Sequence, residues 1–198
     1  QSKLIRQIEA HHAEDYPKAE RLARELVAEC PEVPVFHHNL GVALQERGST
    51  AEAEAEFRTA MDLDPSYLFA RASLATVLLA REEIDEAWEV ISTARIAPRI
   101  HPDALRALME AQARVGFQAG EIEAVRSALK VLRQIAPDSR ALEHFEKPDI
   151  RAALELSEAM IRLWKESCDA LFERRLPDEP TAVDCLRGLV REQLVAKR

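Results

Sequence analysis

The feature that most constrains this chain is a repeat of 34 residues. Ala19, Ala53 and Ala87 recur at that spacing, as do Pro31 and Pro65. A period of this length is typical of arrays in which each unit is one supersecondary structure. Such a unit buries its apolar face only against its neighbours, so several units must stack. The chain is therefore expected to fold as a stack of similar units.

The repeated units are predicted to be helical. The chain contains only 5 glycines and 5% aromatic residues, and it is rich in Ala, Leu, Glu and Arg, which lose little side-chain entropy in a helix. Leu40, Leu44 and Phe57 in one unit, and Ile91 in the next, recur at helical spacing. No run of β-branched residues alternates with polar ones as a strand would. The sequence predicts an all-α fold.

Two adjacent units share a motif. The first reads His37-x-x-Leu40-Gly41-x-x-Leu44, then Ala53-x-x-x-Phe57, Ala60 and Pro65, and the second reads Arg71-x-x-Leu74-Ala75-x-x-Leu78, then Ala87-x-x-x-Ile91, Ala94 and Pro98. This pattern resembles the tetratricopeptide repeat, whose signature is Trp-x-x-Leu-Gly-x-x-Tyr, Ala-x-x-x-Phe and Pro. His37 stands in place of the signature Trp, and Leu44 in place of the Tyr.

The resemblance implies a right-handed superhelix of paired α-helices, the tetratricopeptide solenoid. We expect four helix pairs, at 1–33, 34–67, 68–100 and 101–138, followed by a C-terminal helical cap or association region at 139–198. The first and fourth pairs match less well. Arg6 and Gln7 stand where Leu-Gly is expected, and Ala124 follows Ala87 by 37 residues.

Small and turn-forming residues fit this arrangement. Gly41 and Ala53 place small side chains where two antiparallel helices come closest. Pro31 and Pro65 end second helices, because proline lacks an N–H and clashes with the preceding turn. Gly48 is expected to form the turn within its pair, with an N-cap at the following serine.

The C-terminal region is expected to contain a long amphipathic helix at about 149–174. Its apolar positions, with Ser157 as a polar interruption, are Ile150, Leu154, Ile161, Trp164, Cys168 and Leu171. One interpretation is a capping helix that covers the end of the solenoid. The other is pairing with a second copy or a partner helix, since the spacing also suits a coiled-coil seam. The breadth of the apolar stripe favours the cap. A final helix is expected after Pro180.

The resemblance also implies a working surface. In tetratricopeptide arrays the first helix of each unit lines the concave surface, where partners bind as extended peptides or as helices. Carried onto this sequence, the groove residues are Val35, His38, Asn39, Val42, Gln45, Phe69, Ala72, Ser73, Thr76, Arg106 and Met109. Family members that capture a terminal carboxylate use Lys, Arg and Asn at these positions. Here only Asn39 fits, so a carboxylate clamp is not expected.

Several kinds of chemistry find no support in the sequence. A net charge of −8 without a basic stripe argues against nucleic-acid binding, and no apolar stretch is long enough to span a membrane. The 3 cysteines form no Cys-x-x-Cys pair, which favours a reduced, cytoplasmic setting. Neighbouring residues on a helix do not readily share one ion, so the pairs His11-His12 and His37-His38 do not indicate a metal site. We expect no metal, no cofactor and no catalytic residue.

These observations favour a non-catalytic scaffold or adaptor that binds another protein in the groove. A second hypothesis is an accessory domain of a larger enzyme, such as a transferase, because the chain begins at Gln1 without a methionine. A third hypothesis is self-association through the helix at 149–174 to form a homo-oligomer. The expected partner is thus a protein or peptide segment, and neither a nucleic acid nor a membrane.

Overall fold

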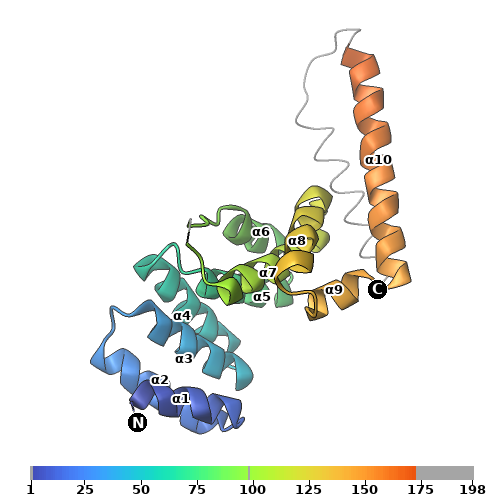
Figure 1. Ribbon diagram of the computed structural model, residues 1–198. Helices are drawn as coiled ribbons and strands as arrows, with labels where there is room; N and C mark the ends of the chain where they lie inside the picture. Colours follow the sequence, from blue (N-terminus) through green and yellow to red (C-terminus); the bar gives the residue numbers. More distant parts are fainter. Residues whose placement is uncertain (1, 98, 173–198) are drawn as a thin grey trace. The chain divides into compact units, whose positions relative to one another are not determined.

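The computed structural model describes residues 2–97 and 99–172, with side chains up to residue 162. This part of the chain consists of helices and contains no β-strand, which confirms the expected all-α fold (Figure 1). The helices are α1 (Lys3–His12), α2 (Tyr16–Glu29), α3 (Pro34–Glu46), α4 (Thr50–Leu63), α5 (Leu68–Ala80), α6 (Ile84–Ser92), α7 (Pro102–Ala119), α8 (Ile122–Ile135), α9 (Arg140–Phe145) and α10 (Pro148–Phe172). The final helix expected after Pro180 lies outside the described residues.

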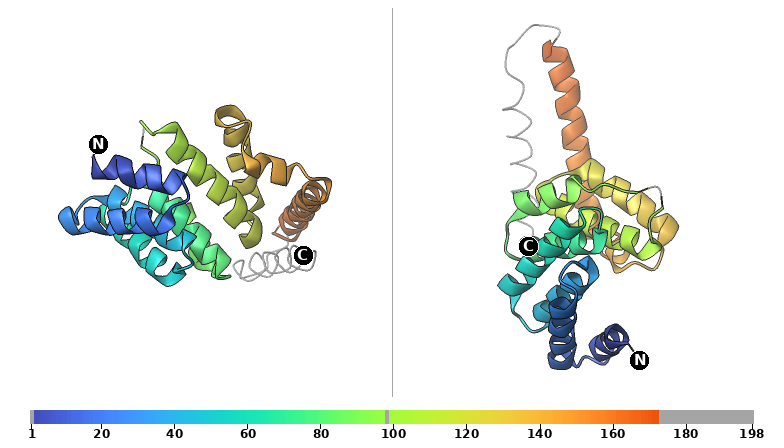
Figure 2. Two further views of the ribbon diagram at one scale, coloured as in Figure 1. Left: turned by 90° about the horizontal axis from the view of Figure 1, so that it is seen from below. Right: turned by 90° about the vertical axis from the view of Figure 1, so that its left-hand side faces the viewer.

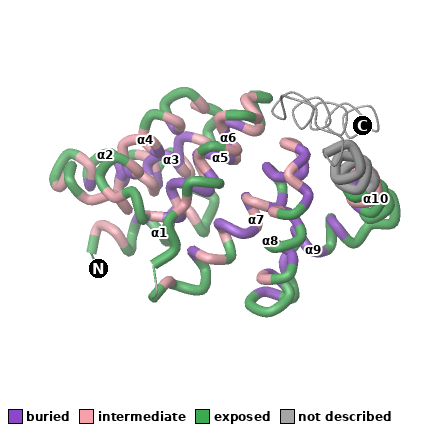
Figure 3. The backbone as a smooth tube through the Cα atoms, turned by 90° about the horizontal axis from the view of Figure 1, so that it is seen from above, coloured by how far each residue is buried: buried purple, intermediate pink, exposed green. Residues whose placement is uncertain are grey.

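The chain divides into two compact units, residues 1–111 and 112–198, with the boundary inside α7. In the first unit each of the helices α1 to α6 packs against the next, as can be followed in Figure 2. In addition, α3 contacts α5, so the first helices of these successive pairs are neighbours. Much of α5 is buried, as Figure 3 shows in purple. The division of the array at residue 138 stays a prediction.

Each helix pair turns through one residue with a left-handed backbone. The φ angle is +58° at Glu14, +79° at Gly48, +63° at Glu82 and +77° at Gly120. The first three lie at the same position of the 34-residue repeat. Glycine adopts this conformation without strain, whereas a side chain clashes with the following carbonyl. Gly48 thus forms the expected turn, while Ser49, at the N-cap of α4, makes no side-chain capping hydrogen bond.

The α3–α4 pair is tightly packed at Gly41. A Cβ atom added to Gly41 would lie 2.5 Å from Cε1 of Phe57, whose side chain is completely buried. Glycine is therefore required there by the ring of Phe57, as the motif predicts. In the α5–α6 pair the same positions hold Ala75 and Ile91, both buried.

The residues that replace the signature Trp are polar and buried, and both bind the backbone ahead of their own helix. Nε2 of His37 donates to the carbonyl oxygen of Pro31 at 2.8 Å. At the equivalent place Nη2 of Arg71 donates to the carbonyl oxygen of Pro65 at 3.3 Å. The His37 ring also lies 2.7 Å from Oε2 of Glu56 on α4. Each of these side chains therefore ties a first helix to the segment that precedes it.

In the second unit α8 packs against α9, and α10 packs against both. Phe117 and Phe145 contact edge to face with ring centroids 5.5 Å apart, and Nε of Arg126 on α8 lies 2.9 Å from Glu158 on α10. Ser157, the polar interruption in the apolar stripe, is buried and donates its hydroxyl to the carbonyl of Ala153 at 2.8 Å. Its polar group is thus satisfied within its own helix.

Candidate functional site

The first helices of the first unit bring together most of the predicted groove residues. We call this surface the first-helix face and define it by the side chains of Ile5, Ile8, Val35, His38, Asn39, Val42, Phe69, Ser73 and Thr76. Its members recur at the repeat spacing: Ile5, Asn39 and Ser73 are 34 residues apart, and so are Ile8, Val42 and Thr76. The face is therefore formed by equivalent positions of successive repeats.

Two polar contacts cross the face from helix to helix. Nδ2 of Asn39 on α3 donates to Oε1 of Gln7 on α1 at 3.1 Å. Nε2 of His38 on α3 shares a hydrogen bond of 3.2 Å with Oγ of Ser73 on α5. The hydroxyl of Thr76 donates to the carbonyl of Ala72 in its own helix at 2.8 Å. His38, Asn39, Ser73 and Thr76 thus each take part in a hydrogen bond within the protein, whereas the buried Nδ1 of His38 has no hydrogen-bond partner.

His38 is the centre of an aromatic cluster. Its ring centroid lies 5.7 Å from that of Phe57, 5.6 Å from Tyr67 and 6.0 Å from Phe69. Burial in this cluster lowers the pKa of His38 to about 4, because desolvation disfavours the charged imidazolium. Desolvation likewise raises the pKa of Tyr67 to about 12. Both side chains are therefore uncharged at neutral pH.

The exposure of the predicted residues varies. Val35, Val42, Gln45 and Phe69 are half-buried, whereas Ala72 and Met109 are buried. Arg106 is exposed, and its guanidinium lies 3.6 Å from Asp103 on the same helix.

The first pair adds residues that the sequence reasoning missed. Ile5 is 46% exposed and Ile8 is 40% exposed, which makes them the most accessible large apolar side chains of the face. Gln7 is buried where the motif has glycine, and it accepts the bond from Asn39. The sequence contained a signal for them, because Ile5 and Ile8 lie 34 residues, or one repeat, before the predicted groove residues Asn39 and Val42.

Formal charge is nearly absent from α3 and α5. Within Pro34–Glu46 the only Asp, Glu, Lys or Arg is Glu46, at the end of the helix. Within Leu68–Ala80 the only one is Arg71. Arg71 is buried, and its guanidinium donates to the carbonyl of Val90 and to the hydroxyl of Thr93. The centre of the first-helix face therefore presents no exposed charged group.

The second helices, in contrast, carry a ladder of ion pairs. On α2 Glu20 pairs with Arg24 at 2.8 Å and also with Arg47, and Arg24 reaches Glu52 on α4 at 2.9 Å. The hydrogen bond from Arg24 holds the pKa of Glu20 below its ordinary value, and the Arg47 guanidinium acts in the same direction. A surface hollow of about 450 Å³ lies beside this ladder; its lining residues are Pro17, Glu20, Arg21, Arg24, Glu25, Ala28 and Arg47.

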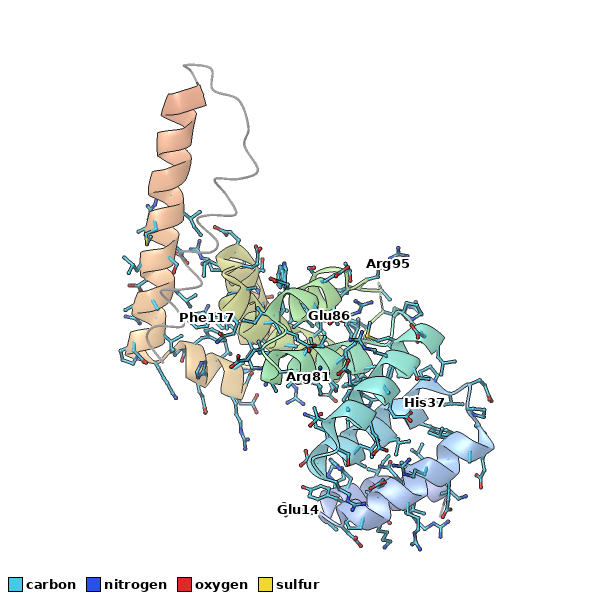
Figure 4. The ribbon with its side chains drawn as sticks, turned by 180° about the vertical axis from the view of Figure 1, so that it is seen from behind. Glu14, His37, Arg81, Glu86, Arg95 and Phe117 are labelled. Carbon is cyan, nitrogen blue, oxygen red and sulfur yellow. The ribbon has the colours of Figure 1, made fainter. Side chains whose placement is uncertain are left out.

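The same ladder recurs one repeat later. Glu54 pairs with Arg58 at 2.9 Å and with Arg81, and Arg58 reaches Glu86 at 2.6 Å. Arg81 and Glu86 belong to the α5–α6 pair and are labelled in Figure 4. Charge is therefore concentrated on the second helices and on the turns, away from the centre of the first-helix face.

The predicted association helix lies in the second unit. Leu154 is buried and Ile150 and Ile161 are half-buried. The side chains of Trp164, Cys168 and Leu171 lie outside the described residues. On the same helix Leu156 is 53% exposed. Its use as a cap or as an association surface stays a prediction.

Among the described residues, no group of three or more His, Cys, Asp or Glu side chains is arranged to hold a metal ion. The rings of His11 and His12 contact each other with centroids 6.1 Å apart. In the part of the chain that the structure describes, no helix has the length and apolar character needed to cross a bilayer.

No family model matches the chain, and no curated protein is similar to it in sequence. Solved structures do resemble it. The structure of pilF from Pseudomonas aeruginosa has a TM-score of 0.55 at 16% identity, over 69% of this chain and 61% of that chain. MamA from Desulfovibrio magneticus RS-1, from its residue 41 to the end, has a TM-score of 0.53 at 16% identity, over 83% of this chain and 94% of its own.

A chain in the structure of Naa15/Naa10 bound to HypK-THB is also similar, with a TM-score of 0.52 at 17% identity. That match covers 99% of this chain and 29% of that chain. At these identities the likenesses show the fold, an array of paired helices.

Proposed function

We propose that this chain, whose paired helices have the tetratricopeptide-repeat fold, is a non-catalytic scaffold that binds a segment of another protein on its first-helix face. The observation that carries the proposal is the exposure of Ile5 and Ile8 beside the uncharged centre of that face. Contiguous exposed apolar surface is typical of interaction sites.

The contrast with the second helices supports the same choice of surface. Their ion pairs, such as Arg24 with Glu52, are exposed to water. Exposed pairs of this kind contribute little to binding or to stability, about 0–1 kcal/mol each. Desolvating Glu54 or Arg58 would cost free energy, whereas covering Ile5 and Ile8 releases water from apolar surface. A partner therefore gains more on the first-helix face.

The proposal is tested by capture from a native lysate with two matched double variants. In the first, Ile5→Lys with Ile8→Lys places two charges on the face. In the control, Ala51→Lys with Ala55→Lys places the same charges at exposed positions of α4. Circular dichroism checks that both fold. We expect proteins identified by mass spectrometry with the unchanged chain to be lost with the first variant and kept with the control. Equal capture by both variants would contradict the proposal.

A second candidate function is an accessory part of a larger enzyme assembly. The observation that favours it is the match to 29% of a chain in the structure of Naa15/Naa10 bound to HypK-THB, which is an assembly of several proteins. Reading the full open reading frame and its genomic neighbours tests this candidate. An encoded catalytic domain in the same frame, or co-purification with an enzyme, is the expected result, and the absence of both would count against it.

A further inference from the structure

Arg71 is a buried cation that forms no ion pair with the described residues. It is 7% exposed, and its guanidinium donates to the carbonyl oxygens of Pro65 and Val90 and to the hydroxyl of Thr93, all of which are uncharged. Its Nε atom is buried without a hydrogen-bond partner. Burial lowers the pKa of Arg71, whereas hydrogen bonds to carboxylates raise the pKa of Arg24. Buried charges in proteins are normally paired, so a counter-ion is expected for Arg71.

The preceding repeat shows which charge is missing. His37 is the equivalent of Arg71, and its ring lies 2.7 Å from Oε2 of Glu56. The residue equivalent to Glu56 is Val90, which has no acidic group. One pair therefore provides a carboxylate beside a histidine, and the next provides none beside an arginine that is charged at neutral pH. A counter-ion for Arg71 has to come from a position other than 90.

Thr93 is the position through which an anion can reach Arg71. Its Oγ1 accepts a hydrogen bond from Nη1 of Arg71 at 3.0 Å, and the residue is exposed. The equivalent Thr59 lies inside α4, which continues to Leu63, whereas α6 ends one residue before Thr93. Residues 94–97 then follow without regular secondary structure. A hydroxyl beside an exposed non-helical segment is accessible to a modifying enzyme.

We propose that Thr93 is a phosphorylation site and that the guanidinium of Arg71 holds the phosphate. A protein kinase transfers the γ-phosphoryl group of a nucleoside triphosphate: a bond forms between phosphorus and Oγ1 of Thr93, the bond to the nucleoside diphosphate breaks, and the hydroxyl proton is released. The phosphate carries a charge of about −1.5 to −2 at pH 7. Its oxygens are stronger acceptors than the hydroxyl that they replace. A free anion has less access, because the unpartnered Nε of Arg71 is buried.

The other charges near Thr93 act in both directions. Glu89 lies one turn earlier on α6, and the carbonyl groups at the end of a helix disfavour an anion. Arg95, which Figure 4 labels, is an exposed cation two residues after Thr93. The Thr93 hydroxyl donates to the carbonyl of Glu89 at 2.8 Å, and the backbone N–H of Thr93 still donates to that carbonyl after the modification. The attraction of Arg71 is expected to dominate, because a buried charge is screened less than exposed ones.

The test uses full-length chains with one phosphorylated residue, introduced during synthesis as phosphothreonine at position 93 or as phosphoserine at position 92. Ser92 is the matched control, because it is exposed at the same helix end and its hydroxyl also bonds the carbonyl of Glu89, at 3.4 Å. Both chains are also made with Arg71→Met, and circular dichroism checks that each folds. Urea unfolding gives the stability, and phosphorus NMR gives the second pKa of each phosphate. The unmodified chain is unfolded with and without inorganic phosphate.

We expect phosphate at position 93 to lower the equilibrium constant for unfolding at least about fivefold, and phosphate at position 92 to leave it unchanged or raise it. The gain at position 93 should vanish with Arg71→Met. The second pKa of the phosphate should be lower at position 93 than at position 92 by at least about half a unit, and this comparison does not need the Arg71→Met chain to fold. Mass spectrometry of the chain isolated from the cells that make it, with phosphatases inhibited, should find the phosphate on Thr93.

Four results would overturn the proposal. Equal effects at positions 92 and 93, or a gain that survives Arg71→Met in a folded chain, would show that Arg71 does not hold the phosphate. Equal stabilisation of the unmodified chain by inorganic phosphate would make Arg71 a site for a free anion. Absence of phosphate on Thr93 in the chain isolated from its own cells would show that the position is not modified. None of these results bears on binding at the first-helix face.

Discussion

The α3–α4 and α5–α6 pairs share one repeat but fill it with different side chains. Where the two helices of a pair come closest, the first pair has Gly41 against Phe57, and the second has Ala75 and Ile91. All of these positions are buried. A larger residue on the first helix is thus accompanied by a smaller one on the second. The repeat sets where the helices meet, and the combined volume of the two residues sets how they fill the contact.

The α1–α2 pair follows the same rule. It has Gln7 at the glycine position and Ala23 at the phenylalanine position, and they are 3% and 0% exposed. The pairs also differ in their buried polar residue. His37 uses a side-chain partner, Glu56, whereas the equivalent Arg71 uses the backbone carbonyl of Val90. The motif therefore specifies which positions are buried between the helices, and the side chains and hydrogen bonds at those positions differ from pair to pair.

The prediction with the largest expected effect tests whether the combined volume of the two contacting residues is limited. Gly41→Ala places a Cβ 2.5 Å from the ring of Phe57, which is fully buried, so the ring or the helix must shift. We expect a loss of about 2–3 kcal/mol in the free energy of unfolding, in the range of overpacked cores, although alanine favours the helix. Urea denaturation followed by circular dichroism measures it.

The double variant Gly41→Ala with Phe57→Ile sharpens this comparison, because it copies the residues of the α5–α6 pair. We expect its loss in the free energy of unfolding to be smaller than the sum of the two single-variant losses by at least about 1 kcal/mol, and this difference is the coupling energy between the two sites. If the two changes are simply additive, the rule of shared volume is wrong for this pair.

The second prediction concerns the buried polar residues. Arg71→Met keeps an unbranched apolar side chain in place of the arginine stem but removes the hydrogen bonds to Pro65, Val90 and Thr93. Two backbone carbonyls then lose a partner, so we expect a loss of about 2 kcal/mol. His37→Met removes one carbonyl contact, and Glu56 is close enough to water to be hydrated, so a loss of about 1 kcal/mol is expected. The ratio of the two losses, from denaturation curves, is the measurement. An equal effect would mean that the contacts to the end of α6 contribute nothing.

The sequence predicts the helices and the fold of this molecule better than it predicts the contacts between side chains. The 34-residue period and the small residues at Gly41 and Ala75 are local signals, and they were sufficient to predict the fold. The long C-terminal helix, expected at about 149–174, is observed at Pro148–Phe172. These features depend on residues a few positions apart, which a pattern records directly.

The polar contacts of the face were not predictable in the same way. Asn39 was predicted as a groove residue, and its amide donates to Gln7, which is 32 residues away in the sequence. His38 meets Ser73 across 35 residues. Such pairs depend on how neighbouring units dock, which no motif encodes. Ile5 and Ile8 were missed for another reason, since the first unit departs from the motif at Arg6 and Gln7.

A third prediction concerns protonation. His38 and Ala72 occupy equivalent positions in the two pairs, but only His38 can be protonated. His38 has a folded pKa of about 4, below its ordinary value of 6.5. The unfolded chain therefore takes up a proton at a higher pH than the folded chain does. Its contribution to stability is present above pH 6.5 and is lost as the pH falls toward 4, by about 1–2 kcal/mol at pH 5.

The measurement is the free energy of unfolding between pH 7 and pH 4.5, for the unchanged chain and for His38→Gln. Glutamine does not titrate in this range and still reaches Ser73 with an amide, so the variant should show a shallower fall. Identical pH curves would show that His38 is more hydrated than its burial among Phe57, Tyr67 and Phe69 indicates.

The smallest expected effects have opposite signs in the two pairs. Gly48 has φ +79° with open space around its missing Cβ, so Gly48→Ala should cost about 1 kcal/mol through backbone strain alone. Glu82 has φ +63° at the same position of the next pair, and Glu82→Gly should stabilise the chain by up to about 1 kcal/mol, reduced by the greater freedom of glycine in the unfolded state. The control Glu82→Ala removes the carboxylate but keeps the Cβ in the left-handed conformation, so it should not stabilise. If alanine and glycine at position 82 raise the thermal midpoint equally, the stabilisation comes from removing the charge of Glu82. The left-handed backbone at position 82 would then not cost free energy in the way expected from position 48.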